Sequence, residues 1–174
     1  PGAVNFSSPG NGSPAHLAGE LLKTRTGIDM LHVPYKGGGP AVTDMIAGHV
    51  SFTLATPAEI MPHVKDGKAR ALAVTTADRT SLAQGVPTMR EAGVPDYEIT
   101  VWYGITAPRG TPSTVVAKLE KAFAEVMANP EVRERMISMG LEPTPMGAAQ
   151  FGEFLKREQA KWAELVRVSG ATAD

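Results

Sequence analysis

Three times near its N-terminus, the chain runs from a short apolar segment through a turn of small residues into a helix-like stretch. The segments predicted as strands are residues 4–6, 29–34 and 50–55. The helix-like stretches open at Pro14, Pro40 and Pro57, where a missing N–H costs nothing because the first turn of a helix leaves it unpaired. Such alternation at short spacing is typical of βαβ units. We therefore predict an α/β fold with a mainly parallel sheet covered by helices.

The chain changes character after residue 68. Residues 69–75 are nearly all apolar and are predicted as a strand buried on both faces. Residues 98–107 are rich in β-branched and aromatic side chains and are predicted as a long strand. The remainder is predicted as helices at 112–127, 130–140 and 148–169, the first with a buried apolar stripe that includes Val115, Leu119 and Phe123. An all-helical tail after an α/β half predicts that the tail packs on something else.

The first turn is a candidate binding loop. Parallel strands end at one edge of a sheet, so the turns after the predicted strands are expected to converge there. A strand, a Gly/Ser loop and a helix start present backbone N–H groups and a positive helix end, which favour an anion. A plain connection accounts equally well for the same residues. The candidate ligand-binding residues of this loop are Ser7, Ser8, Gly10, Asn11, Gly12 and Ser13.

A second helix start offers further candidates. Thr56 and Ala58 begin a helix after a strand, so they are predicted to lend a hydroxyl and an N–H to a ligand, although Thr56 as a simple N-cap is the competing interpretation. Lys36, beside three glycines, is interpreted mainly as a solvated loop lysine. Ser13 and His16 are interpreted as a helix cap and a packing side chain rather than a nucleophile and its base.

Composition excludes several classes of function. The net charge of −1 gives no electrostatic case for nucleic acid, and no apolar run approaches the ~18 residues of a membrane span. Cysteine is absent, and the four histidines lack ligand spacing, so we predict no metal site and no cofactor. No paired carboxylates, nucleotide loop or nucleophile elbow occur, so we predict no catalytic residues and no enzyme.

Several phrases in order resemble the extracytoplasmic solute receptors of the tripartite tricarboxylate transporter system, the Bug or TctC family. They are SSPGNGSPAHLAGELL, HVPYKGGGPAVTDMIAGHV, GKARALAVTTADR, VPTMREAGVPDYE, VWYGITAPRGTP and FLKREQAKWAELVRVSG. The resemblance implies a bilobed, type II periplasmic-binding-protein-like fold that closes on a small carboxylate, such as a dicarboxylate, an acidic amino acid or an aromatic acid. It also implies membrane transporter subunits as partners and a periplasmic location.

The resemblance covers the second lobe of such a receptor. It implies that residues 1–98 form this lobe, that 99–107 form a crossover or hinge strand with Trp102 beside the ligand, and that 108–174 are helices that complete the first lobe. Trp102 as a core aromatic is the competing interpretation. The sequence begins at Pro1 without Met, so we expect it to be processed or truncated, and the resemblance implies that the signal peptide and the first lobe are absent from it. Pro9 stands where glycine is more usual, which removes one N–H from the loop.

Two other functions compete with a transport receptor. A ligand-sensing domain of a regulatory protein uses a related two-lobe fold, but it normally carries a helix-turn-helix segment that does not occur here. A hydrolase built on Ser13 and His16 lacks an oxyanion motif and a third triad member. If the first lobe is absent, the apolar stripes of the helices at 112–127 and 148–169 predict that the chain either self-associates through these helices or folds them onto the second lobe.

Overall fold

The computed structural model describes residues 3–170, which divide into two compact units. The first contains residues 3–100 and 162–170, and the second contains residues 101–161. This division differs from the expected boundaries at 98 and 107, and the assignment of either unit to a receptor lobe stays a prediction. The outermost ends of the expected domains, residues 1–2 and 171–174, lie outside the described residues.

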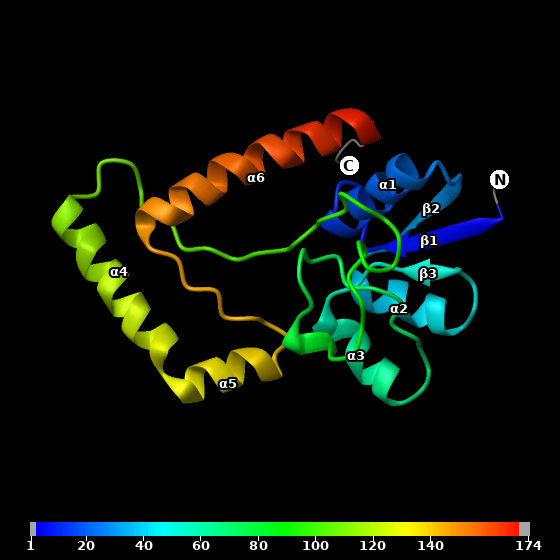
Figure 1. Ribbon diagram of the computed structural model, residues 1–174, viewed down its shortest axis with the longest axis horizontal. Helices are drawn as coiled ribbons and strands as arrows, with labels where there is room; N and C mark the ends of the chain where they lie inside the picture. The colour runs from blue at the N-terminus through cyan, green and yellow to red at the C-terminus, as the bar shows by residue number, and fades with distance from the viewer. Residues whose placement is uncertain (1–2, 171–174) are drawn as a thin grey trace. The chain divides into compact units, whose positions relative to one another are not determined.

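The first unit is built on a parallel sheet with the strand order β2-β1-β3 (Figure 1). Its strands are β1 (Val4–Ser8), β2 (Met30–Pro34) and β3 (Phe52–Thr53). Each strand is followed by a helix, and these are α1 (Pro14–Thr26), α2 (Gly38–Ile46) and α3 (Pro57–Lys65). Both strand pairs are parallel, which confirms the predicted βαβ pattern.

The side chains of β1 alternate between the two faces of the sheet, and helices cover both faces. Phe6 is fully buried and pairs in register with His32 on β2 and Phe52 on β3. Gly19 of α1 lies against the Phe6 ring, so α1 covers this face. Ser7 points to the other face and donates to the Ala41 carbonyl of α2 at 3.1 Å. Burial of a Phe side chain stabilises the fold by roughly 1.5–3 kcal/mol, which makes Phe6 a centre of this core.

A second cluster of the same unit joins distant parts of the sequence. It contains Ala18, Leu21, Tyr97, Ile99 and Leu165, the last from helix α6 (Ala148–Ser169). The Tyr97 hydroxyl donates to the Ala18 carbonyl at 2.7 Å, and burial raises the pKa of that hydroxyl. The C-terminal end of α6 is therefore part of the α/β unit.

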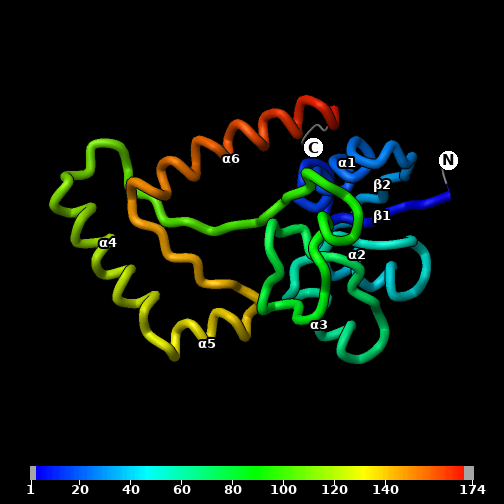
Figure 2. Tube along the Cα trace, in the orientation of Figure 1, coloured from blue at the N-terminus to red at the C-terminus, as the bar shows by residue number. Residues whose placement is uncertain are grey.

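The predicted strand at 69–75 is wrong. Figure 2 shows an irregular trace there, and only Val74 forms an isolated parallel bridge, with Thr88. The bridge consists of Val74 N–H to Pro87 O at 2.8 Å and Met89 N–H to Val74 O at 3.0 Å. Pro87 has no N–H to extend the ladder. Leu72 is 61% exposed, so the segment is not buried on both faces. A short 3₁₀ helix, η1 (Ser81–Ala83), follows.

The predicted strand at 98–107 is also absent, and β3 is shorter than the predicted 50–55. Residues 98–107 are not assigned to a helix or strand. Tyr103 is 80% exposed and Ile105 is 66% exposed. Aromatic and β-branched residues favour extended backbone, but a strand also needs a neighbouring strand, and no such partner occurs among residues 3–170.

The second unit contains helices α4 (Ser113–Ala128) and α5 (Pro130–Ser138) and most of α6, close to the predicted ranges. Neither Thr111 nor Ser113 caps α4, because its N-cap is Pro112. The predicted stripe of α4 is not buried: Val115, Leu119, Phe123 and Val126 are each 40–51% exposed. In this unit, the Trp102 ring instead packs edge-on against Phe151 and Phe154 at 5.8 and 5.2 Å between centroids.

Candidate ligand site at the carboxyl edge of the sheet

Three turns meet at the carboxyl edge of the sheet in the first unit. They follow β1, β2 and β3, and parallel pairing places all three strand ends at the same edge. The first two turns are bonded to each other, from Tyr35 N–H to Ser8 O at 3.0 Å and from Gly37 N–H to Pro9 O at 3.1 Å. The third turn joins them through the Glu59 carboxylate, which lies against Gly38. The predicted convergence is confirmed.

The helices that follow these strands all begin at this edge. The first N–H groups of a helix have no partner within it, and the helix dipole is positive there. Neither α1 nor α2 carries an acidic residue in its first turn, while α3 carries Glu59. The edge therefore favours an anion, with one built-in carboxylate opposing it.

The first turn uses several of its N–H groups internally. Gly10 N–H donates to Ser8 Oγ at 3.2 Å, Gly12 N–H to His16 Nδ1 at 3.1 Å, and Ser13 N–H to Gly10 O at 3.3 Å. Gly10 and Gly12 have φ values of 144° and 70°, which side chains disfavour. The turn is thus held by its own bonds, and a ligand contact from these three amides would require a rearrangement of the turn.

Ser7 and Ser8 belong to β1 rather than to the loop. Both are fully buried. Ser8 Oγ lies 2.6 Å from His32 Nε2, while the Ser7 hydroxyl is bonded to α2. This burial argues against direct ligand contact by either side chain. Both side chains instead form hydrogen bonds within the unit, below the turn. Asn11 and Gly12 are exposed at its tip, and their ligand role stays a prediction.

Ser13 caps α1, as the cap interpretation predicts. Its Oγ accepts from His16 N–H at 3.2 Å and donates to Gly10 O at 2.7 Å. His16 Nδ1 faces Gly12 rather than Ser13 Oγ, so the two residues do not form a nucleophile–base pair. The hydroxyl is committed to the turn.

In the second turn, the side chains fix the loop against α2. The Tyr35 hydroxyl donates to Asp44 Oδ2 at 2.7 Å, which lowers the pKa of Asp44 and raises that of Tyr35. Lys36 is exposed and forms no ion pair with any described residue, in keeping with a solvated loop lysine.

The third turn contains Glu59, which the sequence analysis missed. Its Oε2 accepts from the Thr56 N–H at 3.0 Å and from the Thr56 hydroxyl at 2.8 Å. Thr56 is therefore an N-cap, as the competing interpretation held, and Ala58 is exposed at the helix start. The spacing Thr-x-x-Glu is a capping-box pattern and was the available signal.

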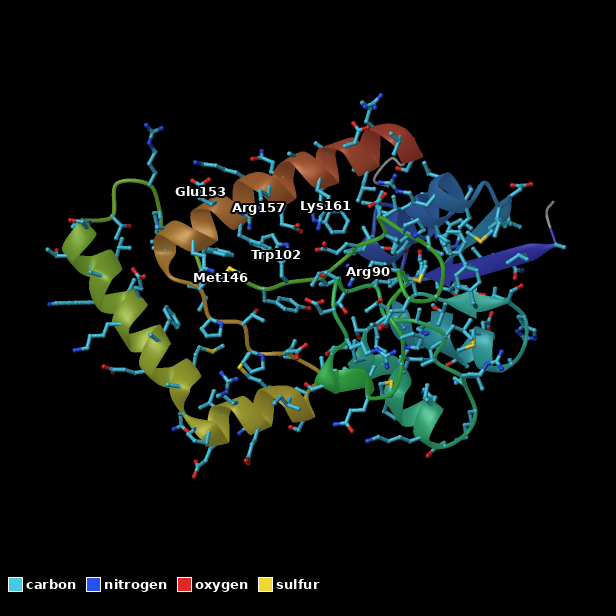
Figure 3. All side chains as sticks on the ribbon, viewed as in Figure 1. Arg90, Trp102, Met146, Glu153, Arg157 and Lys161 are labelled. Atoms are coloured by element: carbon cyan, nitrogen blue, oxygen red, sulfur yellow. The ribbon has the colours of Figure 1, made fainter. Side chains whose placement is uncertain are left out.

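Trp102 lies in the second unit, alongside α6 (Figure 3). Its indole N–H donates to Glu158 Oε2 at 3.0 Å, and Glu158 Oε1 pairs with Lys161 Nζ at 2.5 Å. Because its only polar hydrogen is used within the unit, Trp102 fits the aromatic-cluster interpretation, while its ligand role stays a prediction. Within residues 3–170, no three His, Asp or Glu side chains gather in a metal-binding arrangement.

Comparison with known proteins decides the family. The model of the tripartite tricarboxylate transporter family receptor, TctC, matches residues 1–170. The chain belongs to this family. Protein BugT of Bordetella pertussis is 35% identical over 171 residues, which are 98% of this chain and 52% of BugT. The chain spans about half the length of the first curated relatives that it matches.

Solved structures of this receptor family have the same fold. R. palustris Rpa4515 with adipate is 33% identical with a TM-score of 0.83, over 99% of this chain and 57% of that chain. MatC from Rhodopseudomonas palustris with bound malate is 31% identical with a TM-score of 0.76, over 95% of this chain and 57% of that chain. The family and its structural neighbours are solute-binding receptors and not enzymes, so neither the hydrolase nor the sensing domain is favoured.

In the described part of the chain, no helix combines the length and the apolar character that crossing a bilayer requires.

Proposed function

We propose that the protein is part of a periplasmic receptor that binds a small dicarboxylate and delivers it to the membrane subunits of a tripartite tricarboxylate transporter. The observation that carries the proposal is the convergence of three helix N-termini at one sheet edge, in a chain whose family is a receptor family. Two structural neighbours hold adipate and malate, which are both dicarboxylates.

The exposed groups of this edge suit one end of such a ligand. Asn11 and Ala58 lie at the outer surface of the first and third turns, and Lys36 adds a cation to the second. Helix N-termini and a nearby cation both attract a carboxylate. Glu59 opposes it, because its charge lies at the start of α2. The helix N-termini and Lys36 therefore attract a carboxylate at this edge, while the charge of Glu59 repels it. Removing that charge separates the two effects.

The test is a titration of the chain with adipate, malate and neutral diol analogues, followed by amide NMR. We expect the acids, and not the diols, to shift the amides of the three turns. Glu59→Gln keeps the length and hydrogen bonds of the capping box while it removes the charge. It should tighten binding roughly two- to fivefold, because a charge at a helix terminus is worth about 0.3–1 kcal/mol.

Asp66→Asn is the matched control, since Asp66 is the C-cap at the opposite end of α3. It should leave the acid affinity unchanged. Acid-induced shifts that avoid the three turns, or weaker binding by Glu59→Gln than by the unaltered chain, would contradict this site.

A further inference from the structure

Two histidines from different elements lie directly under the first turn. The rings of His16 on α1 and His32 on β2 stack with centroids 3.9 Å apart and 11° between their planes. The Phe6 ring stacks on His32 at 5.0 Å. His16 is 8% exposed, so the stack continues the buried face of the sheet up to the turn.

Each ring supports one of the two glycines of the first turn, Gly10 and Gly12, which both have positive φ. Gly12 N–H donates to His16 Nδ1, so this nitrogen carries a lone pair and the ring proton resides on Nε2. His32 Nε2 is bonded to Ser8 Oγ, and the same oxygen accepts from Gly10 N–H. A proton on His16 Nδ1 would place a donor against the Gly12 donor, and this contact of the turn would be lost.

The surroundings of both rings disfavour their charged form. Burial lowers the pKa of His16, with Glu20 opposing and Lys23 reinforcing the effect. Burial, the neighbouring His16 and Lys23 lower the pKa of His32 from 6.5 to about 4. Glu20 and Lys23 are the charged groups of α1 that face the pair, and they are bonded to each other at 3.0 Å. From β1, the pair meets Ser8 and Phe6, which carry no charge.

We propose that His16 and His32 are positioning residues that hold the turn at 9–13 in its binding conformation while both rings are uncharged, so that carboxylate binding weakens when the pair takes up a proton. The effect on carboxylate binding rests on the function proposed above. The effect of the two histidines on the conformation of the turn does not depend on that function.

The sign of the pH effect follows from linkage. The unfolded chain protonates its histidines more readily than the folded chain, so it binds more protons at mildly acidic pH. The stability that neutral His32 provides is complete above its ordinary pKa of 6.5 and is lost as the pH falls toward about 4. Because the pKa of His16 is lowered too, the stability that neutral His16 provides is also lost as the pH falls. Binding that requires the neutral pair should weaken by up to about tenfold per pH unit below the titration midpoint.

The experiment follows the ring nitrogens and the Gly12 amide by NMR across this pH range, without ligand. We expect the Gly12 amide to shift with the same midpoint as His16 Nδ1. His16→Asn places an acceptor at the same δ position that does not titrate, so it should keep the Gly12 bond and remove its pH dependence. His16→Ala should lose the bond at every pH.

Adipate titrations at several pH values then test the binding part. Protonation of adipate affects all variants alike, so the difference between the unaltered chain and His16→Asn isolates the pair. His49→Asn is the control, because His49 lies beyond the far end of α2 and faces Asp44. Its pH profile should match that of the unaltered chain.

The outcomes separate the two proposals. A Gly12 amide that ignores the titration of His16, or identical binding profiles for the unaltered chain and His16→Asn, would overturn the positioning role. Tighter binding at acid pH would show that the imidazolium attracts the ligand and would overturn it too. A pH-linked Gly12 amide without any acid binding would instead overturn the proposed function.

Discussion

At the residue scale, one glycine decides whether α1 can reach the sheet. A Cβ on Gly19 would overlap the ring of Phe6, which is fully buried and cannot move toward solvent. In an exposed helix, alanine is better than glycine by roughly 1 kcal/mol, so propensity and packing act in opposite directions here. Packing should win, because a dense core yields little to an added methyl group.

We therefore expect Gly19→Ala to lower the free energy of unfolding by roughly 1–3 kcal/mol, the usual cost of overpacking. The measurement is urea unfolding followed by circular dichroism. Gly152→Ala is the matched control, because Gly152 lies inside α6 and a Cβ there meets nothing within 4 Å. The control should be neutral or slightly stabilising. Equal effects of the two changes would mean that Phe6 adapts.

At the element scale, α6 is anchored by its C-terminal end. Leu165 is 7% exposed and lies in one cluster with Ala18 and Leu21 of α1, while Val168 on the next turn is 43% exposed. The helix is therefore amphipathic in this part, with Leu165 buried in the cluster and Trp162 packed against it.

Leu165→Ala should destabilise the first unit by about 2–5 kcal/mol, the range for a large-to-small change in a core. Val168→Ala should cost far less, because its side chain already meets solvent. Thermal unfolding of both variants makes the comparison. A Leu165→Ala variant as stable as Val168→Ala would show that α6 contributes little to this core.

At the scale of the whole molecule, the two units differ in how much apolar surface they bury. Each of the buried hydrophobic side chains among the described residues belongs to the first unit. In the second unit, the stripe of α4 remains substantially exposed. Few buried apolar contacts mean low local stability, and an exposed apolar stripe favours association.

We expect amide hydrogen exchange in α4 and α5 to be faster than in α1 and β1.

We also expect the chain to associate as its concentration rises. The double change Leu119→Lys with Phe123→Lys should then shift sedimentation toward the monomer. Lys121→Glu changes a residue of the same helix that is already charged and serves as the control. Uniform protection across both units, together with a monomer at all concentrations, would refute this account.

The sequence by itself determined the elements whose signals are local. The three βα units, the Ser13 cap and the family follow from periodicity, turn residues and ordered phrases, because these depend on neighbours within a few positions. Only the tertiary structure decided the rest. Residues 69–75 and 98–107 have strand-like composition but no partner strand, and Ser7 and Ser8 are buried because β1 runs further than its apolar residues suggest. The stack of His16 on His32 forms only when α1 packs across the sheet, and packing between distant segments leaves no local pattern in a single sequence.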